Sequence, residues 1–299
     1  MRFILLSIVF MSFSLTAQEK PNIIFILADD LGYGEVGFNG QEKIKTPHLD
    51  QMAKDGAVMT NFYAGAPVCG PSRATLFYGQ HTGHAPIRGN PRWTKSGKAV
   101  EMKADDVTLT TELKRAGYST AIFGKWGMNE NLATNLGHPL KQGFDEFVGF
   151  NTHIEAHYHW PSFIWDGYEK VDLDAGVAGS NRLKRKIYAD DIFQEKALDY
   201  IDRKAGEENP FFLYLAYTIP HKGYTAPPAS REFYERLDWQ EKPTKKDSGK
   251  GYEYDEDINT SFAGMVSHMD AYIAELRAKL VAKGIDKKTL IFFTSDNGP

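Results

Sequence analysis

The stretch Ile23-Ile24-Phe25-Ile26-Leu27-Ala28, followed at once by Asp29-Asp30, decides how the rest of the chain is interpreted. A continuous apolar run without alternation is typical of a strand that is buried on both faces of a parallel sheet. Two adjacent carboxylates repel each other, so placing them at the end of such a strand costs stability unless a cation lies between them. The stretch therefore predicts a central strand that ends at a functional edge of the sheet.

Further apolar runs alternate with segments of helical periodicity. We expect strands at Thr120–Phe123, Phe211–Tyr217 and Leu290–Thr294, and helices at Pro47–Ala53 (with Thr46 as N-cap), Leu109–Ala116, Ile187–Lys204 and Ile258–Lys283. Buried strands that alternate with helices predict an α/β fold, with a mostly parallel central sheet covered by helices on both faces. Ligands bind beyond the carboxyl ends of the strands in such sheets.

The last expected strand ends in the same way as the first. Leu290–Thr294 runs into Ser295-Asp296-Asn297-Gly298. Either acidic stretch alone is more often a helix cap or a turn. Together, at neighbouring parallel strand ends, Asp29, Asp30, Asp296 and Asn297 form an all-oxygen set that suits Ca²⁺ or Mg²⁺ and disfavours zinc.

The only cysteine of the chain lies in the segment Pro67–Leu76. Pro71 and Ser72 resemble a helix start, which would place Cys69 at a helix N-terminus, where anions are favoured. Arg73 follows one turn later and could pair with the same anion. The pattern predicts a thiolate nucleophile, and a buried structural cysteine is the alternative.

Composition sets broader limits. The 299 residues, 42% of them hydrophobic, carry a net charge of −4, which fits a soluble globular protein and argues against nucleic acid as a partner. Residues 1–17 resemble a signal peptide, with Arg2, an apolar run too short for a membrane span, and Ala17 before the cleavage site. An N-terminal core strand or membrane anchor is the alternative. We therefore expect an exported protein, periplasmic or secreted, with residues 18–299 as its catalytic domain. The charged stretches 181–186 and 242–250 are expected to be exposed loops.

Cys69-Gly70-Pro71-Ser72-Arg73 resembles the Cys-x-Pro-Ser-Arg signature of the formylglycine-dependent (type I) sulfatases, in the alkaline-phosphatase-like superfamily. Other segments resemble the same family, from about Pro21 to Pro299: Ala28–Gly34, Thr46–Asp50, Gly117–Trp126, Pro210–His221 and Ser295–Gly298. The resemblance implies an alkaline-phosphatase-like α/β fold and hydrolysis of sulfate esters, with a sulfated carbohydrate or another small sulfate ester as substrate.

The resemblance also implies a role for each matching residue. Cys69 would be oxidised to formylglycine by a formylglycine-generating enzyme, and its hydrate would attack the sulfate sulfur. The metal, usually Ca²⁺ with Mg²⁺ as the alternative, would be bound by Asp29, Asp30, Asp296, Asn297 and the modified Cys69. Arg73 would hold the diol, Lys125 would contact the sulfate or the diol, and His221 would protonate the leaving alcohol.

Three features depart from the family pattern. Gly127 stands where the family commonly has histidine, and His153, His157 or His159 could compensate. Tyr78 stands where the family often has threonine, within the segment that the modifying enzyme reads. The chain ends at Pro299, where family members continue through a further lysine into a C-terminal subdomain, so we expect that subdomain to be absent and leave the activity of this chain open.

Substrate contacts are expected from His157 and Arg88, and His84, Asn90 and Trp93 are further candidates for the pocket wall. An exposed loop is the alternative for these segments. Two other functions remain open: a phosphonate or phosphate ester hydrolase of the same superfamily, and an inactive protein that binds sugar sulfates. A redox thiol protein is disfavoured because no second cysteine is present.

Overall fold

The computed structural model describes residues 19–90, 100, 102–129, 132–173, 186–237, 239, 252 and 254–299. The expected signal peptide, Trp93 and the stretch 242–250 lie outside these residues, as does the stretch 181–186 apart from Lys186.

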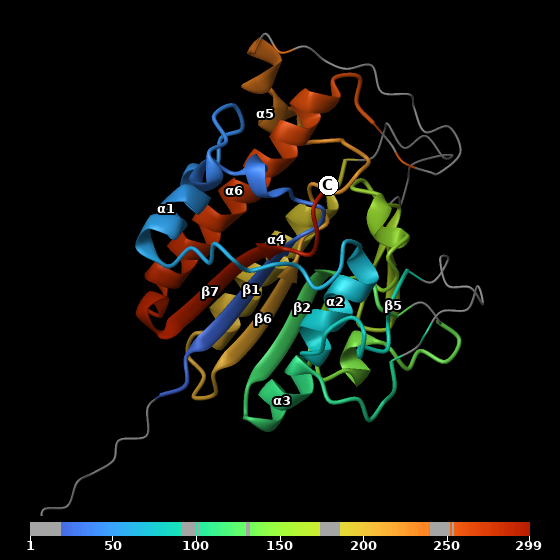
Figure 1. The fold of residues 1–299 in the computed structure, drawn as a ribbon. Coiled ribbons are helices and arrows are strands. Elements are labelled where there is room, and N and C mark those ends of the chain that lie inside the picture. Colours follow the sequence, from blue (N-terminus) through green and yellow to red (C-terminus); the bar gives the residue numbers. More distant parts are fainter. Residues whose placement is uncertain are drawn as a thin grey trace, which may run out of the picture.

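The core is a seven-stranded sheet with the strand order β5-β4-β3-β2-β6-β1-β7 (Figure 1). Five neighbouring strands are parallel: β7 (Thr289–Ser295), β1 (Asn22–Ala28), β6 (Phe211–Ala216), β2 (Ser119–Lys125) and β3 (Glu146–Phe150). The strands β4 (Phe163–Asp166) and β5 (Glu169–Asp172) add an antiparallel hairpin at one edge. The predicted mostly parallel α/β sheet is therefore confirmed.

Helices cover both faces of this sheet (Figure 1). One face packs against α1 (Pro47–Asp55), α4 (Ala189–Lys204) and α6 (Ile258–Ala282), and the other against α2 (Cys69–Tyr78) and α3 (Leu109–Arg115). The short helix α5 (Pro228–Arg231) contacts α6. The 3-10 turns are η1 (Tyr33–Glu35), η2 (Gly37–Asn39), η4 (Pro139–Lys141), η5 (Glu155–His157), η7 (Tyr234–Arg236) and η8 (Asp286–Lys288).

Alternation along the strands divides the buried side chains into two clusters. Ile24 and Ile26 of β1 belong to the cluster under α4 and α6, whereas Leu27 belongs to the cluster under α2. On the α2 side, the ring of Phe77 meets Trp126 and Tyr214 edge-on at 4.9 and 5.0 Å. Because aromatic packing fixes α2 against the sheet, it also fixes the site at the start of α2.

Strand β7 differs from the expectation of a buried strand. Leu290 is 49% exposed and Phe292 is 39% exposed. Among the described residues β7 pairs only with β1 and forms an edge of the sheet, so an apolar run did not mean burial on both faces.

Helix starts also differ from the sequence expectation. The α2 helix begins at Cys69 itself, before the expected start at Pro71 and Ser72. The Thr46 side chain does not cap α1; it accepts from the Gly37 amide and donates to Asp50.

The start of α1 is capped from α6 instead. The Asp270 carboxylate accepts hydrogen bonds from the backbone N–H groups of His48 and Leu49, at 3.1 and 2.8 Å. These N–H groups have no partner within the helix, and a carboxylate is favoured at this end of the helix dipole. Asp270 therefore joins two helices that are distant in the sequence.

We expect Asp270→Ala to lower the free energy of unfolding by about 1–2 kcal/mol, the usual cost of losing an N-cap. Urea unfolding followed by tryptophan fluorescence measures this loss. Asp202→Ala is the control, because Asp202 pairs with Lys279 and Lys283 at the surface and, within the described part of the chain, no other ion pair involves it. Equal midpoints for Asp270→Ala and the control would contradict the capping role.

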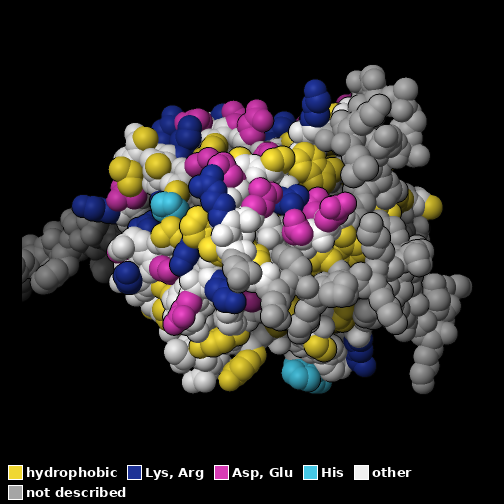
Figure 2. Space-filling model, turned by 90° about the horizontal axis from the view of Figure 1, so that it is seen from above, with side chains coloured by type: hydrophobic (Ala, Val, Ile, Leu, Met, Phe, Trp, Pro, Cys, Tyr) yellow, Lys and Arg dark blue, Asp and Glu magenta, His cyan; other side chains and the backbone are white. Residues whose placement is uncertain are grey.

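None of the described helices is long and apolar enough to cross a membrane. On the face seen in Figure 2, basic and acidic side chains are intermixed over the described part of the surface.

Candidate active site

Two strand ends bring the carboxylates together. Asp29 directly follows β1 and Asp296 directly follows β7, and the two strands are in register at Ala28 and Ser295. The Asp296 amide donates to the carbonyl of Ala28 at 3.1 Å, and the Asp30 amide donates to Asp296 Oδ1 at 3.1 Å. Carboxylate oxygens of Asp29, Asp30 and Asp296 lie within 4.8 Å of one another.

The turn after each strand is shaped to direct these groups inward. Asp30 has φ 63°, a left-handed conformation that aspartate tolerates better than most residues. Ser295 Oγ accepts from the Leu31 amide at 2.9 Å and donates to the Asn297 carbonyl at 2.8 Å. The Asn297 side-chain amide donates to Asp30 Oδ1. Asp30 and Asn297 are thus held against each other across the two turns.

The first residue of α2 faces this cluster. Cys69 Sγ lies 3.5 Å from Asp29 Oδ1 and 3.8 Å from Asp30 Oδ1. The free amide of Gly70 donates to Asn90 Oδ1 at 2.9 Å, and Ser72 Oγ donates to the carbonyl of Asp296. These two bonds anchor the start of the helix beside the end of β7.

The environment of Cys69 contradicts the prediction of a thiolate. Burial raises the pKa of the thiol well above its usual range, and Asp29, Asp296 and Asp30 raise it further, while Lys125 lowers it. The position at a helix N-terminus does not offset burial beside three carboxylates. Without a bound cation, this environment favours the protonated thiol, which is a poor nucleophile.

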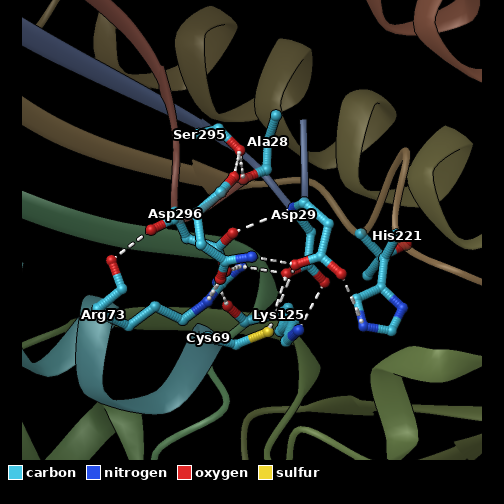
Figure 3. Close-up of polar contacts among 12 residues, drawn as sticks. Ala28, Asp29, Cys69, Arg73, Lys125, His221, Ser295 and Asp296 are labelled. Atoms are coloured by element: carbon cyan, nitrogen blue, oxygen red, sulfur yellow. Dashed lines mark hydrogen bonds and ion pairs between the residues drawn. The ribbon is translucent and has the colours of Figure 1, made fainter. Parts of the chain in front are cut away.

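Two fully buried cations lie against the carboxylates. Arg73 donates from Nε to Asp296 Oδ2 at 3.0 Å, from Nη2 to Asp29 Oδ1 at 3.3 Å, and from Nη1 to the carbonyl of Lys125 at 2.6 Å. Lys125, the last residue of β2, has Nζ 2.5 Å from Asp29 Oδ2. Arg73 approaches the carboxylates from the side opposite His221 (Figure 3).

The charges in the cluster are unequal, because Arg73 and Lys125 face three carboxylates. Burial disfavours ionised Asp29, yet Lys125, His221 and Arg73 hold the pKa of its carboxyl well below the usual range. Burial and the Asp29 charge raise the pKa of Asp30, and they raise that of Asp296 to about 7. When all three carboxylates are ionised, the cluster carries one negative charge more than Arg73 and Lys125 balance, and a bound cation would offset it.

The oxygen atoms of the cluster that could ligate a metal suit a hard cation. Asn297 Oδ1 is buried and has no hydrogen-bond partner among the described residues. This orphaned oxygen lies beside Asp30, and the oxygens of Asp29 and Asp296 complete a set that suits Ca²⁺ or Mg²⁺. The residues present therefore fit the metal that the resemblance implies.

His221 stands at the opposite side of the cluster from Arg73. Its Nε2 lies 3.3 Å from Asp30 Oδ2, and its Nδ1 donates to the carbonyl of Lys222 at 2.9 Å. The ring stacks on His157 with centroids 4.8 Å apart, and Tyr252 lies 4.9 Å from His157. Burial lowers the pKa of both histidines, so each is a neutral ring that can lie against another.

Gly127 leaves this side of the site without the expected histidine. Its φ of 73° is one that a histidine adopts only with strain, and a side chain there would meet Lys125 and Arg73. Of the three histidines considered as substitutes, His157 stacks on His221 and His153 lies 5.9 Å from His157. The third, His159, is buried beneath His221 and bonds to its backbone.

Of the residues expected to contact substrate, His157 lies beside His221, whereas those that follow α2 have other surroundings. Among the described residues, Arg88 donates to the carbonyls of Gly83 and Ala85 rather than to the cluster. His84 is exposed, and Asn90 is used by Gly70. The Tyr78 hydroxyl donates to Asp106, behind α2.

Sequence reasoning missed the roles of the residues that hold the site in shape. These are Ser72, Asn90 and Ser295, which bond to the turns and the helix start, and His159, Thr218 and Asp190, which surround the His221 loop. Only Ser72 and Ser295 carried a usable signal, because they lie inside the motifs.

Fold and site together define the class of protein. The protein is an α/β protein of the alkaline-phosphatase-like fold. Its mostly parallel sheet carries a buried cysteine, two cations and three carboxylates at the carboxyl ends of the strands. The sulfatase family model matches residues 21–299. The chain belongs to the sulfatase family.

Individual relatives agree. N-acetylgalactosamine-6-sulfatase of Mus musculus is 31% identical over 301 residues, covering 94% of this chain and 51% of the relative. The Homo sapiens protein of the same name is 32% identical over 304 residues, with the same coverage. The crystal structure of Ps i-CgsB matches with a TM-score of 0.73 at 28% identity, covering 93% of this chain and 59% of the other. The chain thus spans about half the length of the curated relatives that it matches.

Proposed function

We propose that the chain hydrolyses sulfate esters with a formylglycine formed from Cys69. The observation that carries the proposal is the contact of Cys69 Sγ with Asp29 and Asp30, between the cations and His221. A protonated thiol has little reactivity here, whereas the hydrate of an aldehyde at the same position offers a hydroxyl group. Family membership supports the same chemistry.

The proposed reaction has two covalent steps. One hydroxyl of the residue 69 hydrate loses its proton to solvent and attacks sulfur, and the bond from sulfur to the ester oxygen breaks. His221 first takes up a proton from solvent on Nε2 and then donates it to the departing alcohol. The second hydroxyl then loses its proton to water as the bond from carbon to the sulfated oxygen breaks. Sulfate leaves and the aldehyde is restored, so no second attack at sulfur is needed.

The fixed charges have separate tasks in this reaction. Lys125 contacts the sulfate or the diol, and Arg73 holds the diol indirectly, by orienting Asp29 and Asp296. Calcium, with magnesium as the alternative, would be held by Asp29, Asp30, Asp296, Asn297 and the modified residue 69. When bound, the metal ion supplies Lewis-acid stabilisation of negative charge on the sulfate oxygens.

A sulfated carbohydrate is the proposed substrate class. The relatives named above act on N-acetylgalactosamine 6-sulfate by name, and Ps i-CgsB has been solved with k-i-k-neocarrahexaose. The rings of His157 and Tyr252 beside His221 offer apolar surface for a sugar, and His157 is the proposed contact. Arg88 stays a weaker proposal, because its guanidinium is engaged by loop carbonyls.

Export is proposed from the sequence of residues 1–17, with residues 18–299 as the catalytic part. Export to the periplasm or the medium would bring the chain to extracellular glycans. Conversion of Cys69 requires a formylglycine-generating enzyme as a partner during maturation.

The test compares protein made with and without a co-expressed formylglycine-generating enzyme. Turnover of 4-nitrophenyl sulfate, 4-nitrophenyl phosphate and phenyl phosphonate esters is measured beside the mass of the tryptic peptide that ends at Arg73. We expect sulfate turnover to rise in proportion to the fraction of aldehyde. Faster turnover of the phosphorus esters would instead identify a phosphonate or phosphate ester hydrolase. Complete conversion without turnover of any ester would identify a binding protein.

Calcium is expected to stabilise the folded chain. A ligand that binds only the folded state adds about 2.7 kcal/mol at a concentration 100 times its Kd. Thermal unfolding after treatment with a chelator, and after calcium or magnesium is restored, measures this increment without reference to activity.

Asn297→Ala is the matched control for this measurement, because it removes the orphaned oxygen and leaves all the carboxylates in place. The metal-dependent increment should shrink in this variant. If none of the added cations changes the unfolding temperature of the original chain, the proposed metal site is wrong.

A further inference from the structure

The loop that carries His221 is fastened at both ends by side chains from other elements. At its start, the Thr218 amide donates to Asp190 Oδ1 of α4 at 2.7 Å. At its end, His159 Nε2 lies 3.1 Å from the backbone carbonyl of His221. A carbonyl only accepts, so His159 carries a proton on Nε2 and donates it. The position of His221 therefore depends on Asp190 and His159.

The hydroxyl of Thr218 joins these two fastenings into one chain. Its Oγ1 lies 2.6 Å from Asp190 Oδ2 and 3.1 Å from His159 Nδ1. None of the three residues is more than 2% exposed. Buried polar atoms at these distances need a proton between each pair, because two facing lone pairs repel each other without water to separate them.

The number of protons in the chain follows from this geometry. Thr218 has one hydroxyl proton but two contacts, so one neighbour must supply a second proton. Either Asp190 is a carboxylic acid that donates to Thr218, which donates to His159, or His159 is an imidazolium that donates to Thr218, which donates to carboxylate Asp190. An ionised Asp190 beside a neutral His159 leaves one contact without a proton.

Burial selects the first arrangement. It raises the pKa of Asp190 to about 7, although the Thr218 hydrogen bonds oppose the shift, and it lowers the pKa of His159 to about 4. Both shifts favour an uncharged pair. The titratable and charged groups that face the pair are Asp191, His268, Tyr188, Tyr217 and Tyr272 around Asp190, and His221, Asp29, Lys125 and Tyr188 around His159.

We propose that His159 is a positioning residue that acts through the chain Asp190–Thr218–His159, in which Asp190 is kept as a neutral carboxylic acid. The positioning role rests on the proposed function of His221 as the acid for the leaving group. A small displacement of His221 would slow proton transfer to the departing oxygen. Sulfate binding by Lys125 and the metal site would stay intact.

Two variants of His159 separate positioning from packing. A glutamine amide reaches the place of Nε2 and can donate to the His221 carbonyl, whereas an asparagine amide reaches only the place of Nδ1. We expect His159→Gln to keep kcat within about threefold and His159→Asn to lower it by about 10²-fold, with KM little changed in both. The loss in His159→Asn should be larger for phenyl sulfate than for 4-nitrophenyl sulfate, whose leaving group needs less protonation.

Equal losses in the two His159 variants, or the same loss on both esters, would overturn the positioning role. Circular dichroism and thermal unfolding of each variant identify a fold that is lost. If His159→Asn does not fold, the His159→Gln variant still decides, because loss of its turnover with an intact fold contradicts the proposal.

The protonation of Asp190 is tested independently of any activity. A group whose pKa is raised on folding contributes stability at low pH, and the contribution is lost as the pH rises through about 7. Asp190→Asn has the shape and donors of the neutral acid, so its stability should increase relative to the original chain between about pH 4 and about pH 7. If Asp190→Asn is less stable than the original protein at neutral pH, and this loss of stability does not change with pH, Asp190 is ionised in the folded state. That result would overturn the proposed proton arrangement of Asp190, Thr218 and His159. This result stands even if no ester is hydrolysed.

Discussion

Cys69→Ala is expected to lower kcat for 4-nitrophenyl sulfate by at least about 10⁴-fold, the scale on which enzymes lose turnover without their nucleophile. The proposed hydrate is the only group that forms a bond to sulfur, and no other described side chain in the cluster can replace it. Arg73, Lys125 and the carboxylates remain in place, so sulfate binding should persist. Single-turnover kinetics on protein that has passed through the modifying enzyme measures the loss.

Cys69→Ser is the matched control, because serine keeps the size of the side chain and its contacts with Asp29 and Asp30. It should be as inactive as Cys69→Ala unless the host oxidises serine as well. Both variants should unfold within about 1.5 kcal/mol of the original chain, since the change in volume is small. Residual turnover above about one per cent in Cys69→Ala would remove the proposed nucleophile.

Much of the sheet was predictable because its signals are local. The apolar run of β1 and the acidic residues after it are adjacent in the sequence, and the same holds for β7 and Asp296. Parallel neighbours share an edge, so the meeting of these residues followed from topology. The short strands β3, β4 and β5 were not predicted. The hairpin of β4 and β5 is formed by a turn at Gly167, whose φ is 57°, and a search for hydrophobic periodicity does not detect such a turn.

Burial was less predictable than the elements themselves. An apolar run states that a strand can be buried, but the number of strands and helices around it decides whether it is. Leu290 and Phe292 show this limit at the edge of the sheet. In the same way, the Asp270 cap on α1 joins residues that are 222 positions apart, so no local sequence pattern predicts it.

The candidate site shows the same division. Motifs predicted Cys69, Arg73, Lys125 and His221 as site residues, and the fold brings these four together. The structure does not favour the predicted thiolate of Cys69, because a helix start alone says nothing about three nearby carboxylates. The chain beneath His221 could not be predicted, since Asp190, Thr218 and His159 approach one another only in the folded protein. Sequence reasoning thus reached the residues that we propose to react and missed the contacts that hold them.

Arg73→Met is expected to lower the free energy of unfolding by about 3–5 kcal/mol, the usual cost of removing one partner of a buried ion pair. The guanidinium is fully buried between Asp29 and Asp296, and methionine of similar length fills the space without replacing the charge. Urea unfolding in the presence of a chelator measures the loss, so that a bound cation does not mask it. Arg203→Met is the matched control, because Arg203 pairs with Glu146 and Asp199 on the surface and should cost about 0–1 kcal/mol.

The pH dependence distinguishes lost charge from lost packing. In the original chain the pKa of Asp29 is depressed, so its ionised form contributes stability above the unfolded value, and that contribution is lost only at strongly acidic pH. Without Arg73, the buried carboxylates bind protons more readily in the folded state than in the unfolded chain. The deficit of Arg73→Met should therefore shrink as the pH falls from about 8 to about 5. A deficit that stays constant over this range would mean that Arg73 stabilises the cluster by filling space, and the account of a site built on balanced charge would be wrong.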